Sequence, residues 1–168
     1  MKKTVIRYGT YGAICISVLF LLSWTLLSEF PLATQEVLGY AAMIVSLGFV
    51  FFGIKHFRDH ENDGKVSFKK ALTIGVLISL ITALVFGVLD IFYTEVLNPE
   101  FMDSYYEQTA KKMEETLSAE EFKVKLTELE AQKEMFGNPL FSFLLMAMTV
   151  FVIGFIISLI SSLILQRK

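Results

Sequence analysis

Residues that carry reactive chemistry are scarce in this 168-residue chain. Cys15 is the only cysteine, so the sequence excludes an intramolecular disulfide and a thiolate metal cluster. The formal net charge of −2 excludes a strongly basic protein that binds nucleic acid. There is no Gly-x-Ser-x-Gly elbow, phosphate loop, zinc-protease histidine pair or Cys-x-x-Cys motif. We therefore predict no catalytic, cofactor-binding or metal-binding residues and no enzymatic activity.

Charge is nearly absent from four long apolar stretches, at about residues 8–27, 37–54, 71–93 and 139–165. Asp90 is the only acidic or basic residue within them. About 20 residues of helix, with a rise of about 1.5 Å each, cross a hydrocarbon layer about 30 Å thick. The sequence therefore predicts an all-α fold, a four-helix transmembrane bundle that forms a single membrane domain over residues 1–168 in the lipid bilayer.

The basic residues outside these stretches are distributed unequally. Three precede the first stretch, five lie between the second and the third, and two end the chain: Lys2, Lys3, Arg7, Lys55, Arg58, Lys65, Lys69, Lys70, Arg167 and Lys168. Between the third and fourth stretches, eleven acids outnumber five lysines. Because basic loops remain in the cytoplasm, we expect a protein of the inner (cytoplasmic) membrane with both termini and the second loop cytoplasmic.

The acidic segment, at about residues 98–137, is predicted to form two amphipathic helices. Apolar stripes with helical spacing run through its two halves: Phe101, Tyr105, Thr109, Met113 and Leu117, then Phe122, Leu126, Leu129 and Phe136. The stripes can be covered by each other, by a second copy of the chain or by the membrane interface. The short connection favours an extracytoplasmic helical hairpin between the third and fourth spans.

Capping signals predict where these helices begin and end. Asn98-Pro99 and Asn138-Pro139 each place a capping amide before a proline, as at a helix N-terminus. Ser118 and Glu121 fit a capping box, and Gly137 fits a helix stop. We also expect the four-apart ion pairs Glu107–Lys111 and Glu121–Lys125.

Small residues recur at every fourth position of the third stretch: Ala71, Gly75, Ser79, Ala83 and Gly87. Gly154, Ser158 and Ser162 have the same spacing in the fourth stretch. In lipid, small residues allow close van der Waals packing and interhelical hydroxyl bonds. We interpret the run in the third stretch as a helix-packing seam, with a path for a small solute as the alternative.

Asp90 is the candidate intramembrane acid, because ionisable residues within spans are costly and mark functional sites. Its position near the outer end of the third stretch allows either a structural acid or a proton or cation site. Trp24, Thr25 and Ser28, at the outer end of the first stretch, are its candidate hydrogen-bond partners.

The loop between the second and third stretches contains two patterns of metal-binding type. His56 and His60 are four residues apart, and the run from Asp59 to Ser67 matches part of an EF-hand loop. The last EF-hand position requires a carboxylate but is Lys70. We therefore predict a tight turn at Asn62-Asp63-Gly64, a helix cap at Ser67 and lysines against anionic headgroups.

Three sequence segments resemble a known family. They are Gly39-Tyr40-Ala41-Ala42-Met43, Phe52-Gly53-Ile54-Lys55-His56-Phe57-Arg58-Asp59 and Gly64-Lys65-Val66-Ser67-Phe68-Lys69-Lys70-Ala71, which resemble the signature of domain-of-unknown-function family 4199. The resemblance implies a bacterial protein with about four transmembrane helices, and it implies no activity or substrate. It makes the loop from Arg58-Asp59 to Ser67-Phe68 the family's defining feature, so Lys55, Arg58, Asp59, Lys69 and Lys70 are candidate loop contacts.

Function remains a choice between three classes of protein. We favour a non-enzymatic scaffold or regulator that binds a protein partner or a second copy through the outer helices or the basic loop. The alternative is a transporter or channel for a small solute or protons, acting as an oligomer and motivated by Asp90. An enzyme that acts on lipid is motivated only by His56 and His60.

Overall fold

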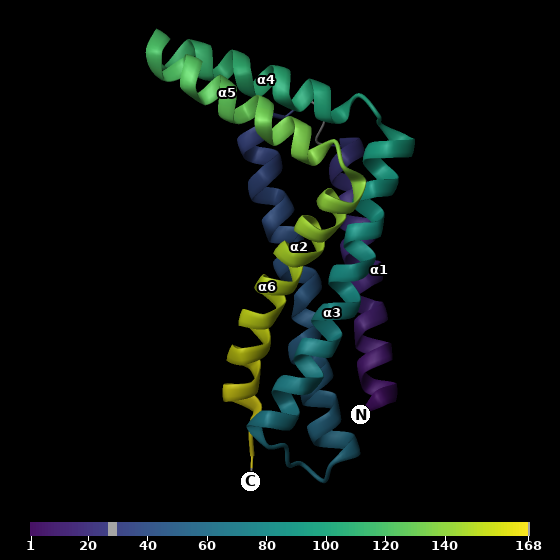
Figure 1. The fold of residues 1–168 in the computed structure, drawn as a ribbon. Coiled ribbons are helices and arrows are strands. Elements are labelled where there is room, and N and C mark those ends of the chain that lie inside the picture. The colour runs from purple at the N-terminus through teal and green to yellow at the C-terminus, as the bar shows by residue number, and fades with distance from the viewer. Residues whose placement is uncertain (27–29, 168) are drawn as a thin grey trace. The chain divides into compact units, whose positions relative to one another are not determined.

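In a computed structural model, residues 1–26 and 30–167 are described, and they form an all-α fold, as predicted (Figure 1). The helices are α1 (Lys2–Leu26), α2 (Leu32–His56), α3 (Phe68–Phe92), α4 (Phe101–Thr116), α5 (Ala119–Phe136) and α6 (Pro139–Leu165). Two π-helical turns, η1 (Phe57–Glu61) and η2 (Tyr93–Leu97), extend α2 and α3. Four of these helical segments are long and apolar enough to cross a membrane: Lys2–Leu26, Ala33–Glu61, Phe68–Leu97 and Pro139–Leu165.

Three of these helices extend beyond the apolar stretches that predicted them. Helix α1 already begins at Lys2, and α2 begins at Leu32. Helix α3 begins at Phe68, because the Ser67 hydroxyl accepts a hydrogen bond from the Lys70 amide (3.4 Å) in its first turn. Apolar composition therefore marks the part of a helix that fits the hydrocarbon, whereas capping and backbone hydrogen bonding decide where the helix ends.

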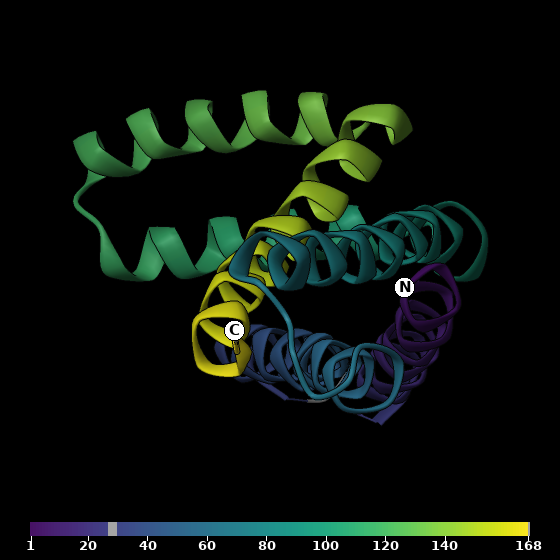
Figure 2. The ribbon, with the colours of Figure 1, turned by 90° about the horizontal axis from the view of Figure 1, so that it is seen from below.

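The chain divides into two compact units, Met1–Phe86 with Met146–Lys168 and Gly87–Leu145. In the first unit, α1, α2 and the adjoining parts of α3 and α6 share a core that includes Ile16, Leu47, Ile74 and Phe86. Figure 2 looks at this unit from the end that carries both termini. The ring centroids of Phe20 on α1 and Phe86 on α3 lie 4.4 Å apart within this core.

Glycines allow close helix contacts in the first unit. A Cβ atom at Gly12 of α1 would lie 2.6 Å from Thr82 Oγ1 of α3 and 3.3 Å from the Ser46 carbonyl oxygen of α2. At Gly53 of α2 it would lie 2.5 Å from Ile78 Cδ1 of α3. Real Cβ atoms essentially never come within 3.0 Å of other atoms, so a larger residue at Gly12 or Gly53 would force Thr82 or Ile78 to shift, and glycine allows the helices to approach this closely.

The second unit contains the end of α3, η2, α4, α5 and the start of α6. Within residues 98–137, every residue of the two predicted apolar stripes is half-buried or buried, and Leu129 and the additional residue Tyr106 are buried. Only Leu117 and Ser118 separate α4 from α5, and Lys133 near the end of α5 pairs with Asp103 near the start of α4 (2.6 Å).

Besides the Ser67 cap of α3, two more of the predicted helix caps are present. The Ser118 hydroxyl accepts from the Glu121 amide (3.4 Å), and the Glu121 carboxylate accepts from the Ser118 amide (3.2 Å), which completes the capping box. The Asn138 side-chain oxygen accepts from the amides of Leu140 (3.0 Å) and Phe141 (3.4 Å) at the start of α6. Helix α5 ends before Gly137, as predicted, although Gly137 has right-handed helical backbone angles.

The predicted cap at Asn98 is wrong. Helix α4 begins at Phe101 after Glu100, and the Asn98 side chain instead donates to the Tyr93 hydroxyl (3.2 Å). The reason is that η2 continues α3 as far as Leu97, so Asn98 ends one helix rather than beginning the next.

One of the two predicted surface ion pairs is also wrong. Lys111 pairs with Glu107 (2.8 Å), as expected. Lys125 pairs with Glu128 (2.7 Å) instead of Glu121, because the capping box already engages the Glu121 carboxylate.

Candidate functional site

The loop between α2 and α3, residues 57–67, has a defined backbone. Its two apolar ends, Phe57 and Val66, are buried. Between them, the Lys65 amide donates to the Asn62 carbonyl (2.9 Å) across Asp63 and Gly64, whose φ angles are 50° and 75°. Positive φ at both central positions is typical of a type I′ turn, so the predicted tight turn at Asn62-Asp63-Gly64 is confirmed. The Asn62 side-chain amide also donates to the Lys65 carbonyl (2.6 Å).

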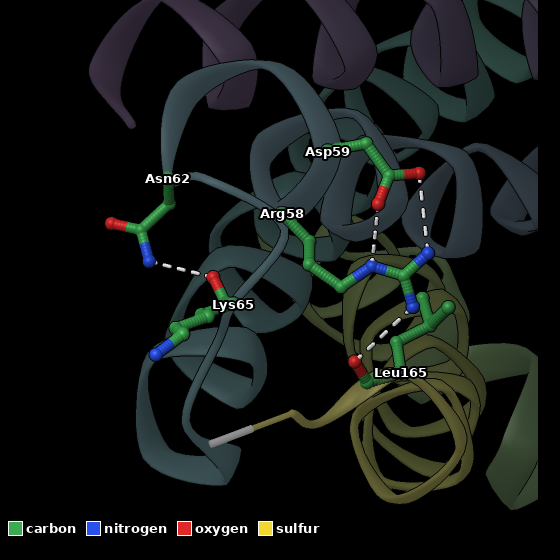
Figure 3. A network of polar contacts seen from close by, with 5 residues as sticks. All are labelled: Arg58, Asp59, Asn62, Lys65 and Leu165. Carbon is green, nitrogen blue, oxygen red and sulfur yellow. Dashed lines mark hydrogen bonds and ion pairs between the residues drawn. The ribbon is translucent and has the colours of Figure 1, made fainter.

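Arg58 connects this loop to the end of α6 (Figure 3). Its guanidinium donates from Nε to Asp59 Oδ1 (2.6 Å), from Nη2 to Asp59 Oδ2 (3.2 Å) and from Nη1 to the Leu165 carbonyl (3.4 Å). The side chain is only 8% exposed. A two-point guanidinium–carboxylate pair is a strong and directional hydrogen-bonding arrangement. The positive charge also lies at the C-terminal, negative end of a helix dipole, where a cation is stabilised.

A single β-bridge adds a second connection between the same segments. The Val66 amide donates to the Arg167 carbonyl (3.0 Å), and the Arg167 amide donates to the Val66 carbonyl (2.9 Å). The Gly64 amide donates to the Arg58 carbonyl (2.8 Å) and closes the loop on itself. Sequence reasoning missed both long-range connections, since neither Leu165 nor Arg167 carries a local signal for a partner about 100 positions away.

The candidate loop contacts differ in what their side chains do. Arg58 and Asp59 bind each other, whereas Lys55 and Lys69 are exposed. Lys70 is also exposed, and its ammonium lies 4.9 Å from the centroid of the Phe57 ring and donates to Asn62 Oδ1 (3.3 Å). Arg58 and Asp59 therefore neutralise each other, whereas the lysines present their charges at the surface.

The histidine pair lies at the start of this loop. The rings of His56 and His60 are stacked with centroids 4.7 Å apart, and His56 also lies 5.5 Å from the ring of Tyr8. Glu61, from the EF-hand-like run, accepts a hydrogen bond from the Thr4 hydroxyl. Within residues 1–26 and 30–167, no group of three or more His, Cys, Asp or Glu side chains is arranged to hold a metal ion.

The small residues of α3 lie against α6. In the first unit, a Cβ atom at Gly75 would lie 2.7 Å from Ser158 Oγ, and one at Gly154 would lie 2.5 Å from both Cβ and Oγ of Ser79. The hydroxyls of Ser79 and Ser158 are 3.3 Å apart. Ala71, Ser79 and Ala83 are buried. In the second unit, a Cβ atom at Gly87 would lie 2.8 Å from the Phe143 ring.

Asp90 is buried in the second unit, where its carboxyl oxygen Oδ2 lies 3.2 Å from the Ser142 hydroxyl of α6. Of the three partners expected from the first span, Trp24 packs its ring against that of Phe20 (centroids 5.6 Å apart), Thr25 donates to the Leu21 carbonyl (2.9 Å), and Ser28 lies outside the described residues. Ser142 was missed because it is an ordinary serine four residues into a helix, with no spacing relation to Asp90.

Comparisons with known proteins give one match. The family described as protein of unknown function (DUF4199) matches residues 7–167. No curated protein and no solved structure matches the chain. The family match covers the α2–α3 loop and its connection to α6, and it assigns no residue a role.

Proposed function

The chain belongs to the DUF4199 family, whose function is unknown, and on that premise we propose that it is a non-enzymatic, multi-pass protein of the bacterial inner membrane that acts by binding a partner protein. In this proposal both termini and the α2–α3 loop are cytoplasmic, and α4 and α5 form an extracytoplasmic hairpin. Support comes from the four apolar helices and from the basic residues that flank them on one side.

Labelling of engineered cysteines tests this orientation. Cys15 would be replaced by serine, and single cysteines would be introduced by Asp63→Cys in the α2–α3 loop and by Glu130→Cys in α5. A membrane-impermeant maleimide added to cells with a permeable outer envelope should label the Glu130→Cys variant and spare Asp63→Cys until the inner membrane is opened. The reverse pattern would contradict the proposed orientation.

The observation that carries the partner-binding proposal is the construction of the α2–α3 loop. Arg58 is fixed by Asp59 and the Leu165 carbonyl, and Val66 is paired with Arg167, so the loop backbone is ordered before any partner arrives. A preorganised surface avoids the entropy cost of ordering a flexible loop during association. The exposed lysines can then meet a complementary acidic surface, which increases specificity and the association rate.

Site-specific photo-crosslinking in native membranes tests this surface. A crosslinker at Lys69, in the first turn of α3 beside the loop, should capture a defined protein, and one at Lys123 on α5, also an exposed lysine, serves as the control. Replacement of Arg58 by alanine should lower the yield of the Lys69 crosslink without touching the crosslinking position, because it removes one of the two connections between the loop and the end of α6. A crosslink of equal yield in the Arg58→Ala variant would contradict the role of loop preorganisation, and no protein crosslink at Lys69 would remove the proposed surface.

A further inference from the structure

Asp90 is the only acidic or basic residue in the four apolar stretches of the sequence. Its surroundings in the second unit contain few groups that could stabilise a negative charge. The side chain is 8% exposed, and Ser142, its hydrogen-bond partner, is 6% exposed. An ionised carboxylate within a membrane span is costly unless it is compensated. A carboxylate in such a place normally requires a cation or several hydrogen-bond donors.

The first turn of α6 could have provided such donors, but its amide groups are already used. Pro139 has no amide hydrogen, the amides of Leu140 and Phe141 donate to the Asn138 side chain, and the Ser142 amide donates to the Asn138 carbonyl (3.1 Å). The positive end of this helix therefore presents no open N–H group to Asp90. The Ser142 hydroxyl is the donor that reaches the carboxyl group.

The charged and titratable groups of the neighbouring α6 and η2 also do not compensate a negative charge on Asp90. Helix α6 contains no acidic, basic or histidine residue from Pro139 to Leu165. In the π-helical turn after α3, Glu95 is exposed, and Tyr93 bonds to Asn98. Among the described residues, no Lys, Arg or His forms an ion pair with Asp90.

Close packing restricts what else can enter the site. One turn before Asp90, a Cβ atom at Gly87 would lie 2.8 Å from the Phe143 ring and 3.1 Å from the Phe143 carbonyl oxygen. Helices α3 and α6 therefore touch beside the carboxyl group. Asp90 and Ser142 together supply far fewer oxygens than the six to eight that Ca²⁺ takes. A proton needs only one carboxyl oxygen and a neighbouring hydroxyl.

We propose that Asp90 is a proton-binding site, held as a neutral carboxylic acid where α3 meets α6 and hydrogen-bonded to Ser142. This proposal is independent of partner binding at the α2–α3 loop. A neutral acid keeps the Ser142 bond, because its carbonyl oxygen accepts from the hydroxyl, and it removes the cost of an uncompensated charge.

Infrared spectroscopy of the full-length protein in micelles of an ester-free detergent at neutral pH tests the proposal. Exposed Asp and Glu side chains are ionised there, so a C=O stretching band from a protonated carboxyl group should come from the buried acid alone. We expect this band in the wild-type protein, its loss in Asp90→Asn, and its retention at a higher frequency in Ser142→Ala, where the hydrogen bond to the carbonyl is gone.

Two results would overturn the proposal. If the wild-type protein shows no protonated-carboxyl band at neutral pH, Asp90 is ionised. If the band persists in the Asp90→Asn variant, the proton is held by a different side chain. Since asparagine has the size of the neutral acid and can still accept from Ser142, the Asp90→Asn variant should fold, and its amide bands confirm this in the same spectrum.

Discussion

Replacement of Gly154 by alanine should weaken the contact between α6 and α3 in the first unit. The added Cβ atom would lie 2.5 Å from both Cβ and Oγ of Ser79 and 3.1 Å from Leu47 Cδ2. Ordinary van der Waals contact begins near 3.4 Å, so the two helices must separate by several tenths of an ångström to about 1 Å. Ser79 cannot simply rotate away, because its Cβ atom is attached directly to the backbone.

The magnitude follows from two contributions. Overpacking of a close contact costs roughly 1 to 3 kcal/mol. Separation of the helices also stretches the 3.3 Å contact between the hydroxyls of Ser79 and Ser158, and interhelical hydrogen bonds in membrane proteins average about 0.6 kcal/mol. Alanine recovers up to about 1 kcal/mol of helix propensity relative to glycine. With that gain subtracted, we expect a net loss of roughly 0.6 to 2.6 kcal/mol in the free energy of unfolding.

Gly48→Ala is the matched control. Gly48 lies in α2, and a Cβ atom there would meet nothing within 4 Å. The same chemical change should therefore be neutral or stabilise by up to about 1 kcal/mol. Reversible unfolding of both variants in mixed micelles, followed by circular dichroism, measures the difference. Equal stability of Gly154→Ala and Gly48→Ala would refute close glycine packing between α6 and α3.

Three further predictions concern the loop connection and the helix caps. Arg58→Ala should lower the free energy of unfolding by about 1 to 3 kcal/mol, because it removes both the charge and the two-point pair with Asp59. Arg58→Lys should cost less, because lysine keeps the charge although it cannot form the two-point pair, and equal losses in an unfolding assay would contradict this. Asn138→Ala should lower the free energy of unfolding by about 1 kcal/mol and Asn98→Ala by less, since of these two side chains only that of Asn138 caps a helix N-terminus. Equal losses would contradict this assignment. Hydrogen bonds from the Ser118 hydroxyl and amide lower the pKa of Glu121. The capping box should therefore contribute fully above the ordinary Glu pKa and be lost as pH falls through the lowered value, and an NMR titration in which Ser118→Ala leaves that pKa unchanged would contradict it.

Features that depend on neighbouring residues in the chain could be predicted well. The apolar stretches predicted four helices of membrane-crossing length, and the Asn62-Asp63-Gly64 sequence predicted its turn. The capping box at Ser118 follows from hydrogen bonds that span only three residues. The failure at Asn98 has the same origin, because two competing local signals, continuation of α3 and initiation of α4, meet there.

The candidate sites could be predicted only in part. Asp90 was singled out because a charged residue in an apolar stretch is conspicuous, yet its partner Ser142 is 52 positions away on another helix. The sequence grouped Arg58 with Lys55, Lys69 and Lys70 as candidate loop contacts. In the structure, Arg58 is buried against Asp59 and the Leu165 carbonyl. The sequence held no information on that burial, since Phe57 and Arg58 belong to a polar loop by composition.

The sequence by itself determined which segments are helical, where α5 and α6 begin, and which residues are small enough to allow close approach. Hydrophobic periodicity and capping act within about one helical turn, so they are readable along the chain. Only the tertiary structure decided that Gly154 lies against Ser79, that Ser142 reaches Asp90 and that Arg167 pairs with Val66. These contacts depend on how far each helix rotates about its own axis and shifts against its neighbour, and small residues permit several such arrangements without selecting one.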